Sequence, residues 1–317
     1  MPSLIGSAFL WKTRGGHDGD VRPLHDGVGL PAWLMLTEYA SAPLPPAFRG
    51  SGVHYPWPPV KWHGGKRYLA QRIIALFPPH RLYLEPFGGA ALVLLNKPPC
   101  EVEIYNDLDQ RISRLSRVLR EQGDAFLAKA SLIPYSQAEF TTAARYPAAA
   151  SDLDKALCDF LRWRQSFGGQ GKSWSYARRR SRGGMAETVH AWWTAIDQLP
   201  AIVDRLQRVQ LLCQPALEAI ERFDDADALI YCDPPYVHST REANSRQVYR
   251  VEMTNDDHRD LARTLRGCKG HVVRSGNPSA LYDELYGDWR RVSFDVANHA
   301  AKGYLKPRRT ECVWMNF

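Results

Sequence analysis

From residue 55 onward, short apolar runs alternate with amphipathic stretches along most of the chain. This alternation is typical of strands separated by helices, and it predicts an α/β fold with a mainly parallel sheet. The expected strands are residues 82–85, 102–105, 209–213, 229–232, 271–275, 291–296 and 311–315. The expected helices are residues 69–76, 90–95, 110–120 and 256–265, the last with Thr254 as its N-cap.

The alternation is interrupted between about residues 124 and 208. This segment contains helical patterns, four tryptophans and the run SFGGQGKSWSYARRRSRGG. We interpret it as an inserted, mainly helical domain, so that residues 55–123 and 209–317 form the surrounding domain. Residues 1–54 carry little pattern and are expected to be a flexible N-terminal extension.

Composition excludes several classes of protein. The 317 residues are 44% apolar and 24% charged, which is unlike a disordered, collagenous or coiled-coil chain. No apolar run approaches the roughly 20 residues of a membrane span. The six cysteines are scattered without a CxxC pair, and no histidine has metal-ligand spacing, so we expect a cytoplasmic protein without a metal. The formal net charge of +7 weakly favours a polyanionic partner.

The most specific motif is Asp233-Pro234-Pro235-Tyr236, which directly follows the apolar run ALIYC. A polar and aromatic group is therefore displayed where a strand ends, at the edge of an open sheet that usually binds ligands. The Asp233 carboxylate and the rigid Pro234 carbonyl can both accept hydrogen bonds from one amino group, and Tyr236 can stack on the ring that carries it. This arrangement suits methylation of an exocyclic amine.

A second motif places glycines between a strand and a helix, in the sequence YLEPFGGA that ends at Ala90. Glycine lets backbone approach a ligand closely, and the GxGxxG pattern of dinucleotide sites is not present. The next strand ends in Asn106-Asp107, where a carboxylate is placed to bind the ribose hydroxyls of an adenosine-containing cofactor. A helix-capping role for this aspartate is the alternative.

Two weaker signals concern the same edge of the sheet. The segment KWHGGK, residues 61–66, precedes the first helix and suggests a loop that closes over a cofactor, with Lys66 near a carboxylate. The segment Ser275-Gly276-Asn277-Pro278 ends a later strand and is a candidate to line the pocket. A generic basic loop and an ordinary turn are the alternative interpretations.

Seven basic residues and no acidic residue lie between Arg162 and Arg182, inside the inserted segment. Glycines make this stretch flexible, and aromatic side chains are interleaved with the basic ones. Basic residues bind phosphates and arginine can recognise guanine, so the stretch predicts contact with DNA. A solvated basic loop is the alternative. The DNA-binding candidates are Lys172, Arg178, Arg179, Arg180 and Arg182.

The motifs KWHGGK, EPFGGA, IYND and DPPY, in this order and with an insert before the last, resemble those of the Dam-like adenine-N6 DNA methyltransferases. The C-terminal RRTECVWMNF is similar to the end of the phage and bacterial branch. The resemblance covers about residues 60–317 and implies a doubly wound, mostly parallel seven-stranded methyltransferase fold with a target-recognition insert. The family's glycine loop usually reads FxGxG, whereas this chain has Ala91 at the final glycine.

The resemblance also implies S-adenosylmethionine as methyl donor, double-stranded DNA as substrate and a base flipped out of the helix. Methylation of one strand at a time requires only a monomer. Asp233, Pro234 and Tyr236 are then the expected catalytic residues. The expected cofactor-binding residues are Trp62, Lys66, Glu85, Phe87, Gly88, Gly89, Asp107 and Asp233. N4-methylation of cytosine, an RNA substrate and a catalytically silent DNA-binding protein remain open at this point.

Overall fold

The computed structural model describes residues 58–61, 66, 69–147, 149–240, 250–297 and 308–317. Trp62 and the proposed extension 1–54 lie outside the described residues. Within the described part, no helix is long and apolar enough to cross a membrane.

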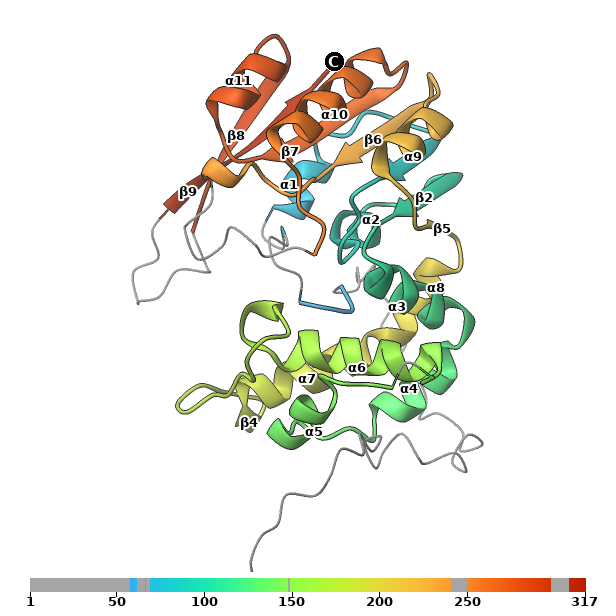
Figure 1. Cartoon of the computed structure of the whole chain (residues 1–317), viewed down its shortest axis with the longest axis vertical. Coiled ribbons are helices and arrows are strands. Elements are labelled where there is room, and N and C mark those ends of the chain that lie inside the picture. The colour runs from blue at the N-terminus through green and yellow to red at the C-terminus, as the bar shows by residue number, and fades with distance from the viewer. Residues whose placement is uncertain (1–57, 62–65, 67–68, 148, 241–249, 298–307) are drawn as a thin grey trace, which may run out of the picture.

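All seven predicted strands are confirmed, and they form one sheet in the order β5-β2-β1-β6-β7-β9-β8 (Figure 1). The strands are β1 (Leu82–Glu85), β2 (Val102–Asn106), β5 (Gln210–Leu212), β6 (Ala228–Cys232), β7 (His271–Gly276), β8 (Arg290–Ala297) and β9 (Arg308–Met315). β5, β2, β1, β6 and β7 pair in parallel, whereas β9 runs antiparallel to both of its neighbours. The sheet is therefore mostly parallel with one reversed strand.

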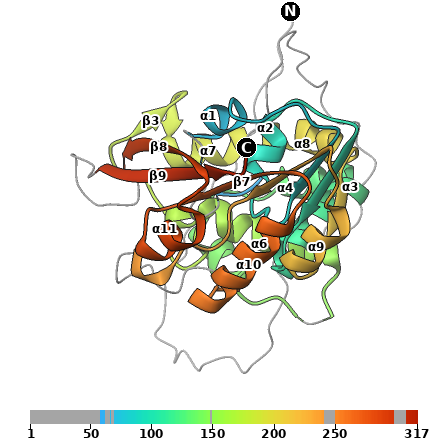
Figure 2. The same ribbon diagram turned by 90° about the horizontal axis from the view of Figure 1, so that it is seen from above.

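Helices cover both faces of the sheet, which explains why the central strands β1 and β6 are buried along their whole length. One face is covered by α9 (Ala216–Phe223), α10 (Asn255–Gly267) and α11 (Ala280–Tyr286), and the other by α1 (Ala70–Ile74), α2 (Leu92–Asn96) and α3 (Gln110–Glu121). Figure 2 shows α9, α10 and α11 on the side of the sheet opposite to α1 and α2. Successive residues of one strand, such as Tyr231 and Cys232, belong to different core clusters, because they point to opposite faces of the sheet.

A second group of helices follows α3 and lies below the sheet in Figure 1. It comprises α4 (Gly123–Ala130), α5 (Gln137–Thr142), α6 (Asp152–Gln165), α7 (Glu187–Asp197), α8 (Leu199–Leu206) and the two-stranded ribbon of β3 (Ser181–Arg182) and β4 (Met185–Ala186). The helices of this group share one core cluster with α3, in which Leu115, Phe160 and Trp192 are buried. An ion pair fixes α8 to the sheet, because Arg205 binds the buried carboxylate of Glu103 at 2.5 Å.

The local helix signals agree with the structure at Thr254 and differ at Ala91. Thr254 caps α10 through a capping box with Asp257, as the sequence predicts. The helix expected from residue 90 begins only at Leu92, because Ala91 adopts a left-handed conformation with φ 57° and ψ 32°. A residue with positive φ cannot continue a right-handed helix, so the glycine turn extends to Ala91.

Candidate active site

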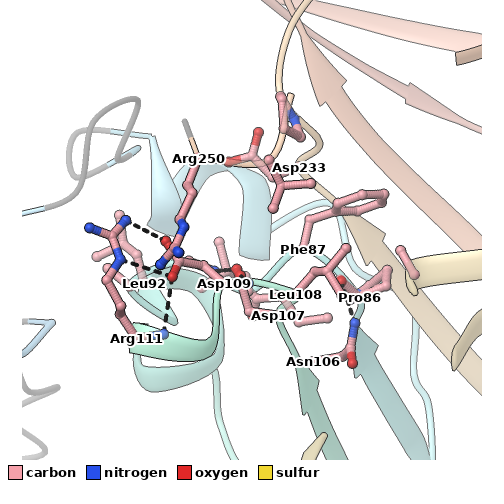
Figure 3. A pocket seen from close by; sticks show the side chains of 18 of the residues that line it. Pro86, Phe87, Leu92, Asn106, Asp107, Leu108, Asp109, Arg111, Asp233 and Arg250 are labelled. Carbon is pink, nitrogen blue, oxygen red and sulfur yellow. Dashed lines mark hydrogen bonds and ion pairs between the residues drawn. The ribbon is translucent and has the colours of Figure 1, made fainter. Parts of the chain in front are cut away.

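A pocket lies where the direction of the sheet connections reverses. The chain continues from β1 to β2 and β5 on one side, and from β6 to β7 on the other, so the carboxyl ends of β1 and β6 border a topological switch point. The pocket there has a volume of about 1260 Å³, including the part open to solvent. In Figure 3, Phe87, Asp107 and Asp233 lie around the same space.

The pocket brings together most of the residues predicted to bind the cofactor. Those that line it are Lys66, Glu85, Phe87, Gly88, Gly89, Asp107 and Asp233. Pro235 also lines it, whereas Pro234 is buried and does not line it. The sequence thus predicted which segments meet, although they are up to 167 residues apart.

The turn after β1 requires glycine at residue 88 for steric reasons. A side chain at Gly88 would collide with the buried ring of Tyr105 in β2. The Tyr105 hydroxyl donates a hydrogen bond of 2.6 Å to the carbonyl of Gly89, which itself has φ 50°. Only glycine allows so close an approach between the turn and β2 at residue 88.

Asp107 closes this turn from the end of β2. Its carboxylate accepts hydrogen bonds of 2.7 Å from the backbone of Gly89 through one oxygen and of 2.7 Å from Asp109 through the other. Burial raises the pKa of Asp107 to about 6. The helix cap of α3 is Asp109 and not Asp107, so Asp107 does not have the capping role considered as an alternative.

Glu85 is a buried carboxyl group at the end of β1. It accepts hydrogen bonds from the Tyr83 hydroxyl at 2.9 Å and from the backbone of Leu94 at 3.0 Å. Burial raises its pKa to about 8, although both hydrogen bonds act in the opposite direction. Burial therefore favours the protonated form of Glu85.

The Asp233 carboxylate is held by two side chains from other parts of the chain. Its Oδ1 atom lies 2.5 Å from the Lys66 ammonium and 3.0 Å from the Ser275 hydroxyl. Lys66 is in turn fixed by its backbone, because its carbonyl accepts hydrogen bonds from the backbones of Leu69 and Ala70, where α1 begins. Both weaker sequence signals, the segment before the first helix and the end of β7, thus meet the strongest one.

Sequence reasoning missed Glu311 in β9. Its carboxylate is only 1% exposed, lies 3.4 Å from the Lys66 ammonium and accepts a hydrogen bond from the Tyr236 hydroxyl. Tyr236 also accepts a hydrogen bond from Lys66. The available signal was a single acidic residue at the head of the buried apolar run CVWM, because a buried charge requires a partner.

The inserted segment also contributes to the pocket, which the sequence did not indicate. Trp163 of α6 lines it, together with Gly169 and Gln170 at the following turn. Gly169 has φ 72°, and a side chain there would collide with the backbone carbonyl of Lys61. A backbone contact therefore joins this turn to the segment that leads to Lys66.

The predicted DNA-binding residues lie outside the pocket. Lys172, Arg178, Arg179, Arg180 and Arg182 are all exposed; the first four lie between α6 and the β3–β4 ribbon, and Arg182 lies in β3. The exposed ring of Tyr176 lies against the Arg178 guanidinium at 5.4 Å. This segment presents positive charge and flat side chains to solvent.

The mostly parallel seven-stranded sheet with its reversed β9 fits a methyltransferase fold. Residues 62–299 match the model of the D12 class N6 adenine-specific DNA methyltransferases, and the chain belongs to this family. Its reaction is methylation of the N6 amine of adenine in DNA. The family implies S-adenosylmethionine as the methyl donor.

The chain is similar to proteins named DNA adenine methylase. It is 26% identical to that of Vibrio cholerae over 211 residues, which cover 64% of this chain and 73% of the relative. The protein from Haemophilus influenzae is 28% identical over 196 residues, covering 59% and 66%. The protein from Escherichia coli K12 is 24% identical over 240 residues, covering 72% and 83%.

Proposed function

We propose that methyl transfer takes place in the pocket between β1 and β6, with the cofactor on the β1–β2 side and the target adenine at Asp233. The observation that carries this proposal is the convergence of Glu85, Asp107 and Asp233 on one pocket at the switch point. Ligands of open α/β sheets bind at such a point.

The lining residues fit S-adenosylmethionine. Glu85 and Asp107 have pKa values raised to about 8 and about 6 by burial, so a cationic ligand beside them would favour their ionised forms. When bound, S-adenosylmethionine supplies a methyl group activated by a positively charged sulfonium. Asp107 would accept hydrogen bonds from the ribose, while Phe87 and the turn at Gly88 and Gly89 would contact the remaining parts. We keep Trp62 as a further contact on the family resemblance alone.

The amine side of the reaction is assigned to the DPPY motif. The Asp233 carboxylate and the Pro234 carbonyl would accept the two N–H groups of the adenine amine, which orients its nitrogen toward the methyl group. Tyr236 would stack on the flipped base. These residues act by positioning and electrostatics, which lower the barrier without a covalent bond to the enzyme.

We further propose that residues 124–208 are a mainly helical target-recognition domain between the two parts of the catalytic domain, 55–123 and 209–317. Its support is that every strand of the seven-stranded sheet comes from those two parts. Lys172 and the arginines at 178, 179, 180 and 182 would bind double-stranded DNA. A monomer is sufficient for this reaction.

The proposal is tested by incubating the protein with unmethylated DNA and labelled S-adenosylmethionine and identifying the labelled nucleoside. We expect N6-methyladenine, with no label incorporated into DNA that the enzyme has already methylated. N4-methylcytosine would contradict the assignment of the base. DNA binding without cofactor binding or transfer would instead identify a catalytically silent DNA-binding protein.

A further inference from the structure

Glu311 is a buried carboxylate that has no role in the proposed methyl transfer. It lies on β9 opposite Phe294 of β8, and only 1% of it is exposed. Burying a carboxylate is costly unless it is paired. Its partners are the Lys66 ammonium, at 3.4 Å, and the Tyr236 hydroxyl, which donates to it. Glu311 therefore contacts two residues beside the reacting amine without lining the pocket itself.

Lys66, Asp233 and Glu311 form a cluster with two acidic side chains and one basic side chain. One ammonium, that of Lys66, lies between the carboxylates of Asp233, at 2.5 Å, and Glu311, at 3.4 Å. The three side chains together carry one net negative charge. Without Glu311, Lys66 and Asp233 would form a neutral pair, and the Asp233 carboxylate would accept hydrogen bonds from a neutral amine less strongly.

The same contacts orient Asp233. Its Oδ1 atom accepts from both Lys66 and Ser275, which occupy the two lone-pair positions of that oxygen. The adenine amine must then bind the other oxygen, Oδ2. The position of the Lys66 ammonium thus decides which carboxylate oxygen receives the substrate.

We propose that Glu311 is a positioning residue that holds Lys66 and shares its charge, so that Asp233 stays oriented and remains a strong acceptor for the amine. This inference rests on the proposed function, because it assigns Asp233 to the amine. Glu311 itself touches neither substrate nor cofactor. It acts through Lys66 across the face of the sheet covered by α1.

The experiment is a double-mutant cycle between Glu311→Gln and Lys66→Met, read as the single-turnover rate of methyl transfer at saturating cofactor and DNA. We expect Glu311→Gln to lower this rate by about tenfold, which corresponds to about 1.4 kcal/mol. Its dissociation constants for cofactor and DNA should stay within about twofold of the original chain. In the Lys66→Met background, Glu311→Gln should have no further effect.

Glu103→Gln is the matched control, because Glu103, like Glu311, is a buried carboxylate on a strand. Its partners are Lys97 and Arg205, and it does not line the pocket. This variant should lose stability while its folded fraction keeps the original rate. If Glu311→Gln does not fold, the same cycle with Glu311→Asp retains the charge and shortens its reach.

Three results would overturn the inference. They are an unchanged rate in Glu311→Gln, additive losses with Lys66→Met, or a loss that disappears only in a Tyr236→Phe background, which would mean that Glu311 acts on the tyrosine. Failure of the unaltered chain to methylate DNA would instead reject the proposed function.

Discussion

The ammonium of Lys66 lies 2.5 Å from the Asp233 carboxylate, although 167 residues separate them in the chain. The contact joins a residue that precedes α1 to the motif that follows β6. Glu85 and Asp107 occupy the other side of the same pocket. A single basic residue thus links the predicted cofactor loop to the predicted amine site, and its replacement should affect both.

The left-handed conformation of Ala91 predicts an unusual response to glycine. Ala90 and Ala91 are adjacent and similarly buried, with 6% and 5% exposed, but only Ala91 has a positive φ. Ala91→Gly should therefore be more stable than Ala90→Gly by about 1–2 kcal/mol, because glycine avoids the left-handed penalty. Urea unfolding of the two variants measures this difference. Equal losses of stability would contradict the assigned turn.

The turn at Gly168 and Gly169 offers a matched pair of substitutions. Both residues have positive φ, so alanine strains the backbone at either site, but only a side chain at Gly169 collides with Lys61. Gly169→Ala should weaken binding of S-adenosylhomocysteine about tenfold or more, and Gly168→Ala much less. Calorimetric titration without DNA tests this. Equal affinities would show that the turn does not shape the pocket.

Glu85 predicts a fall in stability as pH rises. The pKa of Glu85 in the folded chain is about 8, above its usual value of 4.5. Between these two pH values the unfolded chain has lost the proton that the folded chain still binds, so the free energy of unfolding falls as pH rises. Glu85→Gln should flatten the decrease in Tm between about pH 5 and 8.

The control for that experiment is Glu103→Gln. Burial alone would raise the pKa of Glu103, but the hydrogen bonds from Arg205 and Lys97 outweigh it and keep the pKa below its usual value. Its contribution to stability is present at neutral pH and is lost toward acid. A Glu85→Gln variant whose Tm still falls as steeply as that of the original chain would contradict the assignment.

The exposed basic segment predicts the salt dependence of DNA binding. Replacing Arg178, Arg179, Arg180 and Arg182 with alanine should reduce the slope of log affinity against log salt by about 0.9 for each phosphate that the variant no longer binds. The control replaces Arg259, Arg263 and Arg266, which lie on α10 and pair with acidic residues. Titrations at several salt concentrations measure both slopes. An unchanged slope in the first variant would remove the segment from the DNA interface.

The strands could be predicted because each is a short apolar run bounded by turn residues, and the DPPY motif specifies a rigid turn at the end of β6. A parallel sheet then brings Asp107 and Asp233 to one edge without further information. These parts of the site depend on local pattern and on the direction of the strands.

Glu311 and Gly169 could not be predicted in this way, because their contacts depend on tertiary placement. Glu311 reaches Lys66 only because β9 is inserted between β7 and β8, an order that no local pattern specifies. Gly169 reaches the pocket only because α6 packs against α3. At Ala91, the residue type favoured a helix, whereas the turn that begins at Gly88 continues to Ala91, whose backbone donates a hydrogen bond of 2.8 Å to the Gly88 carbonyl and adopts a left-handed conformation.

The most direct test of the proposed reaction is the single-turnover rate of methyl transfer by Asp233→Asn, with binding of cofactor and DNA measured on the same preparation. Asparagine keeps the size of the side chain but removes the negative charge of the carboxylate that would accept a hydrogen bond from the adenine amine. We predict a rate at least about a hundredfold lower than that of the original chain. Both ligands should still bind. Transfer at an unchanged rate would contradict the assignment of Asp233 to the adenine amine.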